Sequence, residues 1–212
     1  MVNEKILESI KKARDMKKRN FKQSFDLAIN IKNIDLKKPE NRIKTEINLP
    51  HSSGRETKIG IIVDNLISQT KDLENVVVIK KGELEKIGKD KKAIRKIAKG
   101  CSYFIAEAPL MPLVGRFLGP ILAPRNLMPT PIPPTADLKS VVKNRRNVIK
   151  IQLKDSPAIH LCVGKEDMDD NKIAENVDTV IKSVITALPK KKEQIKNYVI
   201  KLTMGKPVKF KL

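Results

Sequence analysis

The stretch Ile59-Gly60-Ile61-Ile62-Val63 is continuously apolar, and it decides how the rest of the chain divides. Such a run is typical of a strand that is buried on both faces of a parallel sheet. Two similar runs follow at residues 76–79 and 102–106, and a helical pattern of apolar residues lies between them at residues 83–99. Strands that alternate with helices predict a three-layer αβα (Rossmann-like) domain in the middle of the chain.

The segments on either side of this middle region follow another pattern. Residues 25–31 and 43–49 alternate between apolar and polar side chains, and so do residues 159–163 and 198–202. This period of two is typical of strands in an antiparallel sheet with only one buried face. Apolar residues at helical spacing over 173–188 predict a helix that covers such a sheet. The fold class expected for the whole chain is therefore α+β.

The two patterns together imply an insertion. Residues 1–57 and 157–212, from the two termini, are predicted to build one split α+β domain with an antiparallel sheet and helices. Residues 58–156 are predicted to form the inserted αβα domain. The two connections, near residues 57 and 157, would form a hinge.

The charge balance points to a polyanionic partner. The chain has 44 Lys and Arg against 24 Asp and Glu, a formal net charge of +20 over 212 residues. The excess is spread over all three segments, so a basic tail on a neutral body is disfavoured. Nucleic acid is the leading partner and an anionic membrane surface the second. No apolar run approaches the roughly 20 residues of a membrane span, and two cysteines fit a reducing cytoplasm.

The sequence contains no recognisable motif for catalysis or for binding a cofactor or metal. No glycine cluster follows Val63, where a dinucleotide-binding fold would need one, and no phosphate-binding lysine loop is present. His160 and Cys162 share a strand face, but neither forms a metal-ligand cluster with His51 or Cys101. We therefore expect no catalytic site, no metal and no cofactor. An RNA-modifying enzyme and a general polyanion-binding protein remain as alternatives.

The most specific segment is the proline-rich run from Leu118 to Pro129, with further prolines at 131, 133 and 134. Its physical interpretation is a stiff loop. It resembles the signature of the universal large-subunit ribosomal protein L-one family, in which glycines usually stand at the positions of Ala123 and Asn126. Of the residues other than glycine, Asn is among those that best tolerate a positive φ angle.

Four further motifs occur in the family's order and spacing. Asn20 to Leu27 is similar to a Lys-Phe-x-x-Thr-Val-Glu-Val strand, and Leu49-Pro50-His51 is similar to a Leu-Pro-His turn. The segment 159–165 resembles Ile-His-x-x-Val-Gly-Lys, and Thr203-Met204-Gly205 matches a Thr-Met-Gly turn. The residues after this turn, Lys206-Pro207, resemble those of archaeal members of the family. The resemblance covers nearly the whole chain.

The resemblance implies a function that agrees with the charge. Members of the family are structural proteins of the large ribosomal subunit that bind the stalk region of large-subunit rRNA. They support release of deacylated tRNA from the exit site, and many repress translation of their own mRNA. By this resemblance the partners are rRNA, exit-site tRNA and the chain's own mRNA, with no membrane. The location is the cytoplasmic ribosome, and the free protein is a monomer.

The resemblance also implies which residues touch RNA. They are the residues of the strand motif, the lysine of the Val-Gly-Lys segment and the Thr-Met-Gly turn: Phe21, Lys22, Ser24, Asp26, Lys165, Thr203, Met204 and Gly205. The hydroxyl groups suit a 2′-hydroxyl, the lysines suit phosphates, and Asp26 would orient a base or hydroxyl donor. Because only 3% of residues are aromatic, we expect structured RNA read by shape rather than stacked single strands. Solvent is expected to satisfy the Thr203 hydroxyl in the free protein.

Overall fold

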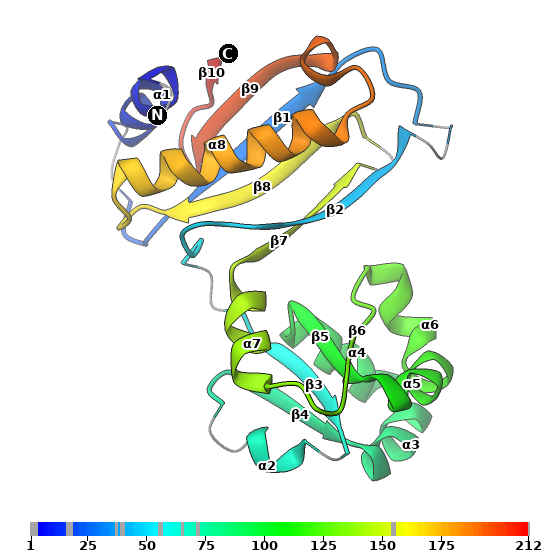
Figure 1. The fold of residues 1–212 in the computed structure, drawn as a ribbon. Coiled ribbons are helices and arrows are strands. Elements are labelled where there is room, and N and C mark those ends of the chain that lie inside the picture. The colour runs from blue at the N-terminus through cyan, green and yellow to red at the C-terminus, as the bar shows by residue number, and fades with distance from the viewer. Residues whose placement is uncertain are drawn as a thin grey trace. The chain divides into compact units, whose positions relative to one another are not determined.

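The chain forms two compact units in a computed structural model that describes residues 4–15, 19–36, 38, 41–54, 57–64, 66–70, 73–153 and 156–211 (Figure 1). The first unit comprises Met1–Arg55 and Asn147–Leu212, and the second comprises Glu56–Arg146. Both ends of the chain therefore belong to one unit, and the other unit is inserted between them.

The first unit is an antiparallel sheet covered by two helices. A four-stranded sheet has the order β10-β9-β1-β8, and β2 and β7 form a separate two-stranded sheet. Helices α1 and α8 pack together against one face of the larger sheet (Figure 1). The elements of this unit are α1 (Glu4–Arg14), β1 (Ser24–Ile31), β2 (Ile43–Asn48), β7 (Val148–Leu153), β8 (Ala158–Lys165), α8 (Asp170–Ala187), β9 (Ile195–Leu202) and β10 (Val208–Phe210).

Alternation along β1 separates the core of this unit from an open face. Phe25, Leu27 and Ile29 are fully buried and pack in one apolar cluster with the inward stripe of α8. The residues between them, from Ser24 to Asn30, are half-buried on the opposite face. The predicted period of two is therefore confirmed for β1, and it leaves the opposite face of this strand only partly buried.

Strand β7 changes the division that the sequence suggested. The predicted second boundary lies at residues 156 and 157, whereas the compact units of the structure meet at residues 146 and 147. The physical reason is that β7 pairs antiparallel with β2, from Ile43 opposite Leu153 to Asn48 opposite Val148. Ile151 and Leu153 are each 1% exposed and belong to the core of the first unit.

The second unit has the three layers that the sequence predicted. Its sheet is entirely parallel in the order β4-β3-β5-β6, and every residue of β3 and β5 is buried. Helix α2 packs with α7, whereas α3, α4, α5 and α6 pack with one another in the other layer (Figure 1). Its elements are β3 (Ile59–Val63), α2 (Ile67–Thr70), β4 (Val76–Lys80), α3 (Lys81–Lys89), α4 (Lys91–Gly100), β5 (Tyr103–Glu107), α5 (Met111–Phe117), α6 (Gly119–Leu122), β6 (Thr130–Ile132) and α7 (Leu138–Arg146).

Two local predictions in this unit are wrong. The single helix expected over 83–99 is two helices, because Asp90 ends α3 and its carboxylate caps α4 by accepting a hydrogen bond from the Lys92 backbone N–H at 2.8 Å. The proline-rich run is not a loop throughout: α6 and a 3₁₀ turn at Ala123–Arg125 occupy it. Pro120 and Pro124 fit there because each lies in the first turn of its helix, where no hydrogen-bond donor is needed.

The same run contains a left-handed residue at the place where the resemblance predicts one. Asn126 has φ +56° and ψ +32°, and it ends the 3₁₀ turn. Ala123, at the other position where the family usually has glycine, has an ordinary helical φ of −61°. The replacement by Ala is therefore free of strain, and Asn is suited to the left-handed site.

Candidate nucleic-acid interface

Three of the predicted residues meet at one end of the large sheet. Ser24 begins β1 and lies opposite Lys165, the last residue of β8. On the other side of β1, Phe25 lies opposite Leu202, the last residue of β9. Thr203 follows Leu202 directly, so segments 179 residues apart in sequence are joined at this sheet end.

Ser24 and Thr203 are held by reciprocal hydrogen bonds. The Thr203 backbone N–H donates to the Ser24 carbonyl at 3.1 Å, and the Ser24 backbone N–H donates to Thr203 Oγ1 at 3.1 Å. Thr203 Oγ1 also donates to the Ser24 carbonyl over a longer 3.4 Å. The expectation that only solvent satisfies the Thr203 hydroxyl is therefore wrong. All these bonds use the Ser24 backbone, and within the described residues its own hydroxyl has no partner.

Gln23 fixes the turn that follows Thr203. Its side chain is 2% exposed, and its Oε1 accepts a hydrogen bond from the Met204 backbone N–H at 3.1 Å. The Gly205 N–H closes the turn by donating to the Leu202 carbonyl at 2.9 Å. Sequence reasoning missed Gln23, although a signal exists: it lies on the inward phase of the alternation that begins at Phe25, where a polar group must be hydrogen-bonded.

Two large apolar side chains stand out from this sheet end. Met204 is 60% exposed at the tip of the turn, and Phe21 is 51% exposed just before β1. From the residues alone, both would be expected in the core. Their exposure beside polar groups is the kind of surface that a partner covers.

The loop after β8 brings acidic residues to the same place. Lys22 Nζ forms an ion pair with Asp167 at 3.1 Å, and its hydrogen bond lowers the pKa of the Asp167 carboxyl below its ordinary value. The Gln23 backbone N–H donates to Glu166 Oε2 at 3.2 Å, and the Glu166 N–H donates back to the Gln23 carbonyl at 2.9 Å. Arg14 of α1 donates to the carbonyls of Glu166 and Met168 and so fastens this loop. A shallow concavity of about 370 Å³ lies between residues 19–22 and this acidic pair.

Lys165 is positioned by a neighbouring loop. Its stem packs against Gly54, where an added Cβ would lie 3.1 Å from Lys165 Cγ and Cδ. Gly54 also has φ +68°, a conformation that side chains other than glycine rarely adopt. The positive φ favours glycine here, and its missing Cβ leaves room for the Lys165 stem.

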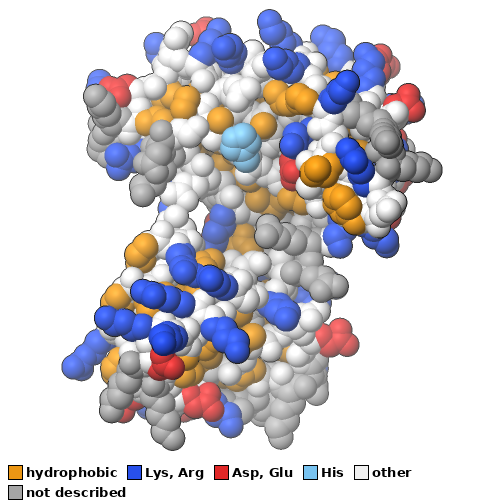
Figure 2. All heavy atoms as spheres, turned by 180° about the vertical axis from the view of Figure 1, so that it is seen from behind, with side chains coloured by type: hydrophobic (Ala, Val, Ile, Leu, Met, Phe, Trp, Pro, Cys, Tyr) orange, Lys and Arg blue, Asp and Glu red, His pale blue; other side chains and the backbone are white. Residues whose placement is uncertain are grey.

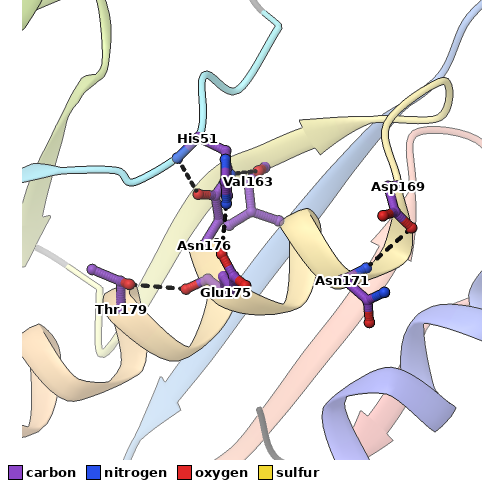
Figure 3. A network of polar contacts seen from close by, with 7 residues as sticks. All are labelled: His51, Val163, Asp169, Asn171, Glu175, Asn176 and Thr179. Carbon is purple, nitrogen blue, oxygen red and sulfur yellow. Dashed lines mark hydrogen bonds and ion pairs between the residues drawn. The ribbon is translucent and has the colours of Figure 1, made fainter. Parts of the chain in front are cut away.

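A buried asparagine anchors that loop to the sheet (Figure 3). Asn176 of α8 is fully buried, its Oδ1 accepts from the His51 backbone N–H at 3.0 Å, and its Nδ2 donates to the Val163 carbonyl at 2.9 Å. The His51 ring also contacts the Glu175 carboxylate. The Leu-Pro-His motif is thus part of the scaffold behind Lys165. Asn176 was missed, although a lone polar residue on the apolar stripe of α8 was a signal.

Asp26 is farther along the open face than the other predicted residues. It is half-buried and lies opposite Cys162 of β8 and Lys201 of β9. The structure therefore groups Phe21, Lys22, Ser24, Lys165 and the turn 203–205 at one sheet end, with Asp26 one pleat away.

Nothing described in the chain suggests covalent or metal chemistry. Burial raises the pKa of the Cys101 thiol, the opposite of what a nucleophile requires. In the described residues no cluster of three His, Cys, Asp or Glu side chains is arranged to hold a metal ion. Of the helices described, none is long and apolar enough to cross a membrane. The grouped residues instead offer hydroxyls, cations and apolar surface.

Comparison with known proteins decides the family. The model of the ribosomal protein L1p/L10e family matches residues 10–206. The chain belongs to the ribosomal protein L1p/L10e family. It is 47% identical to the large ribosomal subunit protein uL1 of Methanobrevibacter smithii over 206 residues, 96% of this chain and 97% of that protein. Identity to the uL1 proteins of Methanothermobacter thermautotrophicus and Pyrococcus abyssi is 42% and 45%, over 98% of this chain and 99% and 96% of theirs.

These comparisons confirm the resemblance to the archaeal type of the L1 family. The two-unit α+β fold with its antiparallel and parallel sheets is consistent with L1 architecture. The matched proteins are structural rather than catalytic, which agrees with the prediction that the chain is not an enzyme.

Proposed function

We propose that this L1 protein is a structural component of the large ribosomal subunit in the cytoplasm and binds the stalk region of large-subunit rRNA. The observation that carries the proposal is the group at the end of β1, where Ser24, whose hydroxyl has no partner among the described residues, occurs at the same sheet end as the exposed Phe21 and Met204. The net charge of +20 and the similarity to archaeal large ribosomal subunit proteins support it.

The chemistry of this sheet end fits a shallow RNA minor groove. Ser24 offers a hydroxyl that can donate to or accept from a 2′-hydroxyl, while the exposed Met204 offers apolar contact to sugars. Lys22 and Lys165 would meet phosphates, and Lys22 would exchange its ion pair with Asp167 for one with the backbone. Asp26 would orient a base or hydroxyl donor at the edge of the contact.

Binding of a stalk rRNA fragment and of a scrambled RNA of equal length tests the proposal. A specific contact predicts tighter binding to the stalk fragment at every salt concentration. Equal affinity for both RNAs would instead favour a general polyanion-binding protein, which the spread of positive charge along the chain also suits.

The remaining partners belong to the same proposal. We propose that the free protein is a monomer, that on the ribosome it supports release of deacylated tRNA from the exit site, and that it represses its own mRNA. Support is the family membership together with the hydroxyl, cationic and apolar groups at the end of β1, which suit structured RNA. A translation reporter carrying the chain's own leader should be repressed by added protein, and a reporter with a scrambled leader of equal length should not.

We also propose that the first unit carries the specific contact and that the inserted unit carries only general affinity. Residues 1–55 joined by a short linker to 147–212 should fold and keep the preference for stalk rRNA. A chain that joins residues 1–55 to 157–212 instead should fold poorly, because it lacks β7, the partner of β2. A folded chain of the first design without the preference would show that the assignment to this unit is wrong.

A further inference from the structure

Helix α4 of the inserted unit carries a continuous row of cations. Its sequence is KKAIRKIAKG, with Ile94 and Ala98 buried against the sheet layer. A helix turns about 100° per residue, so the cations fall within an arc of about 140° on the side away from those apolar residues. We call this row the α4 basic stripe; its members, all exposed, are Lys91, Lys92, Arg95, Lys96 and Lys99.

No described acidic side chain neutralises the α4 basic stripe. The helix itself contains no Asp or Glu, and none of the five cations forms an ion pair within the part of the chain that the structure describes. Two helices of the first unit carry acidic residues among their cations: α8 pairs Lys182 with Asp178 at 2.6 Å, and α1 has Glu4 and Glu8 among its lysines. Figure 2 shows Lys and Arg side chains gathered on one face of the inserted unit.

The stripe works against the stability of its own helix. Lys91 with Arg95, Lys92 with Lys96, and Arg95 with Lys99 are like-charged pairs four residues apart, and such pairs destabilise a helix. Lys91 and Lys92 also lie in the first turn, where the helix dipole is positive. An ordinary solvated surface would interleave these lysines with glutamates. A bound polyanion would remove the repulsion, so the arrangement is explained by a ligand.

We propose that the α4 basic stripe is a second RNA-binding surface, which holds the phosphate backbone of rRNA without reading its sequence. The stripe is a straight row on a convex helix, with points of charge about 6 Å apart along the axis at residues 91, 95 and 99. Such a row suits an extended chain of phosphates. A membrane is less suitable, because the apolar residues of α4 face inward and leave no bulky apolar side chain to insert into lipid. The inference rests on the proposed function in taking RNA as the partner.

The test is the salt dependence of RNA binding by the full chain. The triple variant Lys92→Gln, Arg95→Gln, Lys96→Gln removes three phosphate contacts. The slope of log K against log salt should flatten by about 2 to 3 units, because each contact contributes about 0.7 to 0.9. The loss should be equal on stalk and scrambled RNA, so the preference between them stays unchanged.

A matched control removes the same charge elsewhere. The variant Lys5→Gln, Lys11→Gln, Lys12→Gln changes three lysines of α1, which lie among glutamates, and should change the slope by less than about one unit. Thermal unfolding separates binding from folding: the α4 variant should melt at the same temperature as the unchanged protein or a higher one, since it relieves repulsion.

Each other outcome is decisive. Equal slopes for the α4 variant and the unchanged protein, or equal flattening by the α1 control, would overturn the assignment. A lipid surface would be indicated if the α4 variant no longer sedimented with phosphatidylserine vesicles that the unchanged protein binds, while its RNA salt slope stayed the same. That result would also overturn the assignment. Failure of the proposed function gives a different result: the unchanged protein would show no preference for stalk RNA over scrambled RNA. The salt slopes of the α4 variant can still be measured in that case, because they are also determined on scrambled RNA.

Discussion

Replacing Ser24 by alanine separates RNA contact from folding at the sheet end. The hydrogen bonds that join Ser24 to Thr203 use the Ser24 backbone, so Ser24→Ala leaves them in place. The free energy of unfolding should change by less than about 0.5 kcal/mol, as for other surface substitutions. In the complex an RNA hydroxyl would lose its partner, which costs about 1–3 kcal/mol and weakens binding from about fivefold to about 150-fold.

Thr203→Val is the matched comparison, because it removes a hydroxyl that the fold itself uses. The Ser24 N–H loses its acceptor at 3.1 Å. Since this sheet end is accessible to water, the cost in stability should lie near the lower end, at about 1 kcal/mol. Thr203→Val should therefore lower both stability and affinity, whereas Ser24→Ala should lower affinity alone.

Filter binding to stalk and scrambled RNA, with urea unfolding of each variant, measures these effects. The affinity loss for Ser24→Ala should appear on stalk RNA only and leave the salt slope unchanged, since no charge is removed. If Ser24→Ala bound stalk RNA within twofold of the unchanged protein, the Ser24 hydroxyl would not be a contact. An equal loss on scrambled RNA would show that the contact is not specific.

Three further substitutions test the scaffold. Gln23→Leu keeps the size of the side chain but leaves the Met204 N–H without its acceptor, so urea unfolding should show a loss of about 1–3 kcal/mol, accompanied by weaker stalk RNA binding. Lys22→Ala should raise the pKa of the Asp167 carboxyl toward its ordinary value, as measured by NMR titration. Because the ion pair lowers this pKa, the pair stabilises the fold above the ordinary carboxyl pKa. The stabilisation is lost as the pH falls through the lowered pKa. Asn126→Val should destabilise the chain by about 1–2 kcal/mol more than Asn126→Gly in thermal unfolding, because a β-branched residue does not tolerate φ +56° whereas glycine does.

The sequence predicted the strands whose patterns were repetitive. Alternation from Phe25 to Ile31 located β1 and its buried face, and the continuous run at Ile59–Val63 located a strand that is buried throughout. Burial imposes a period on side chains, so these features can be read without coordinates. Asn126 was also foreseen as a tolerant residue at a left-handed position.

The features that were missed depend on contacts between distant segments. The pairing of β7 with β2 joins residues a hundred or more positions apart; the alternation of Ile149, Ile151 and Leu153 with polar residues indicates a strand but does not identify its partner. The break at Asp90 depends on a single cap within an uninterrupted helical pattern. Gln23 and Asn176 matter because of the backbone groups they meet, and only the fold brings those groups within reach.

Cross-linking on the ribosome tests the central claim most directly. Large subunits that contain this protein would be irradiated, and the cross-linked peptides and RNA positions would be identified by mass spectrometry and sequencing. The account predicts peptides containing residues 19–24 and 203–205 joined to the stalk region of large-subunit rRNA. Cross-links to other rRNA regions, with both peptides free of attached RNA, would contradict it.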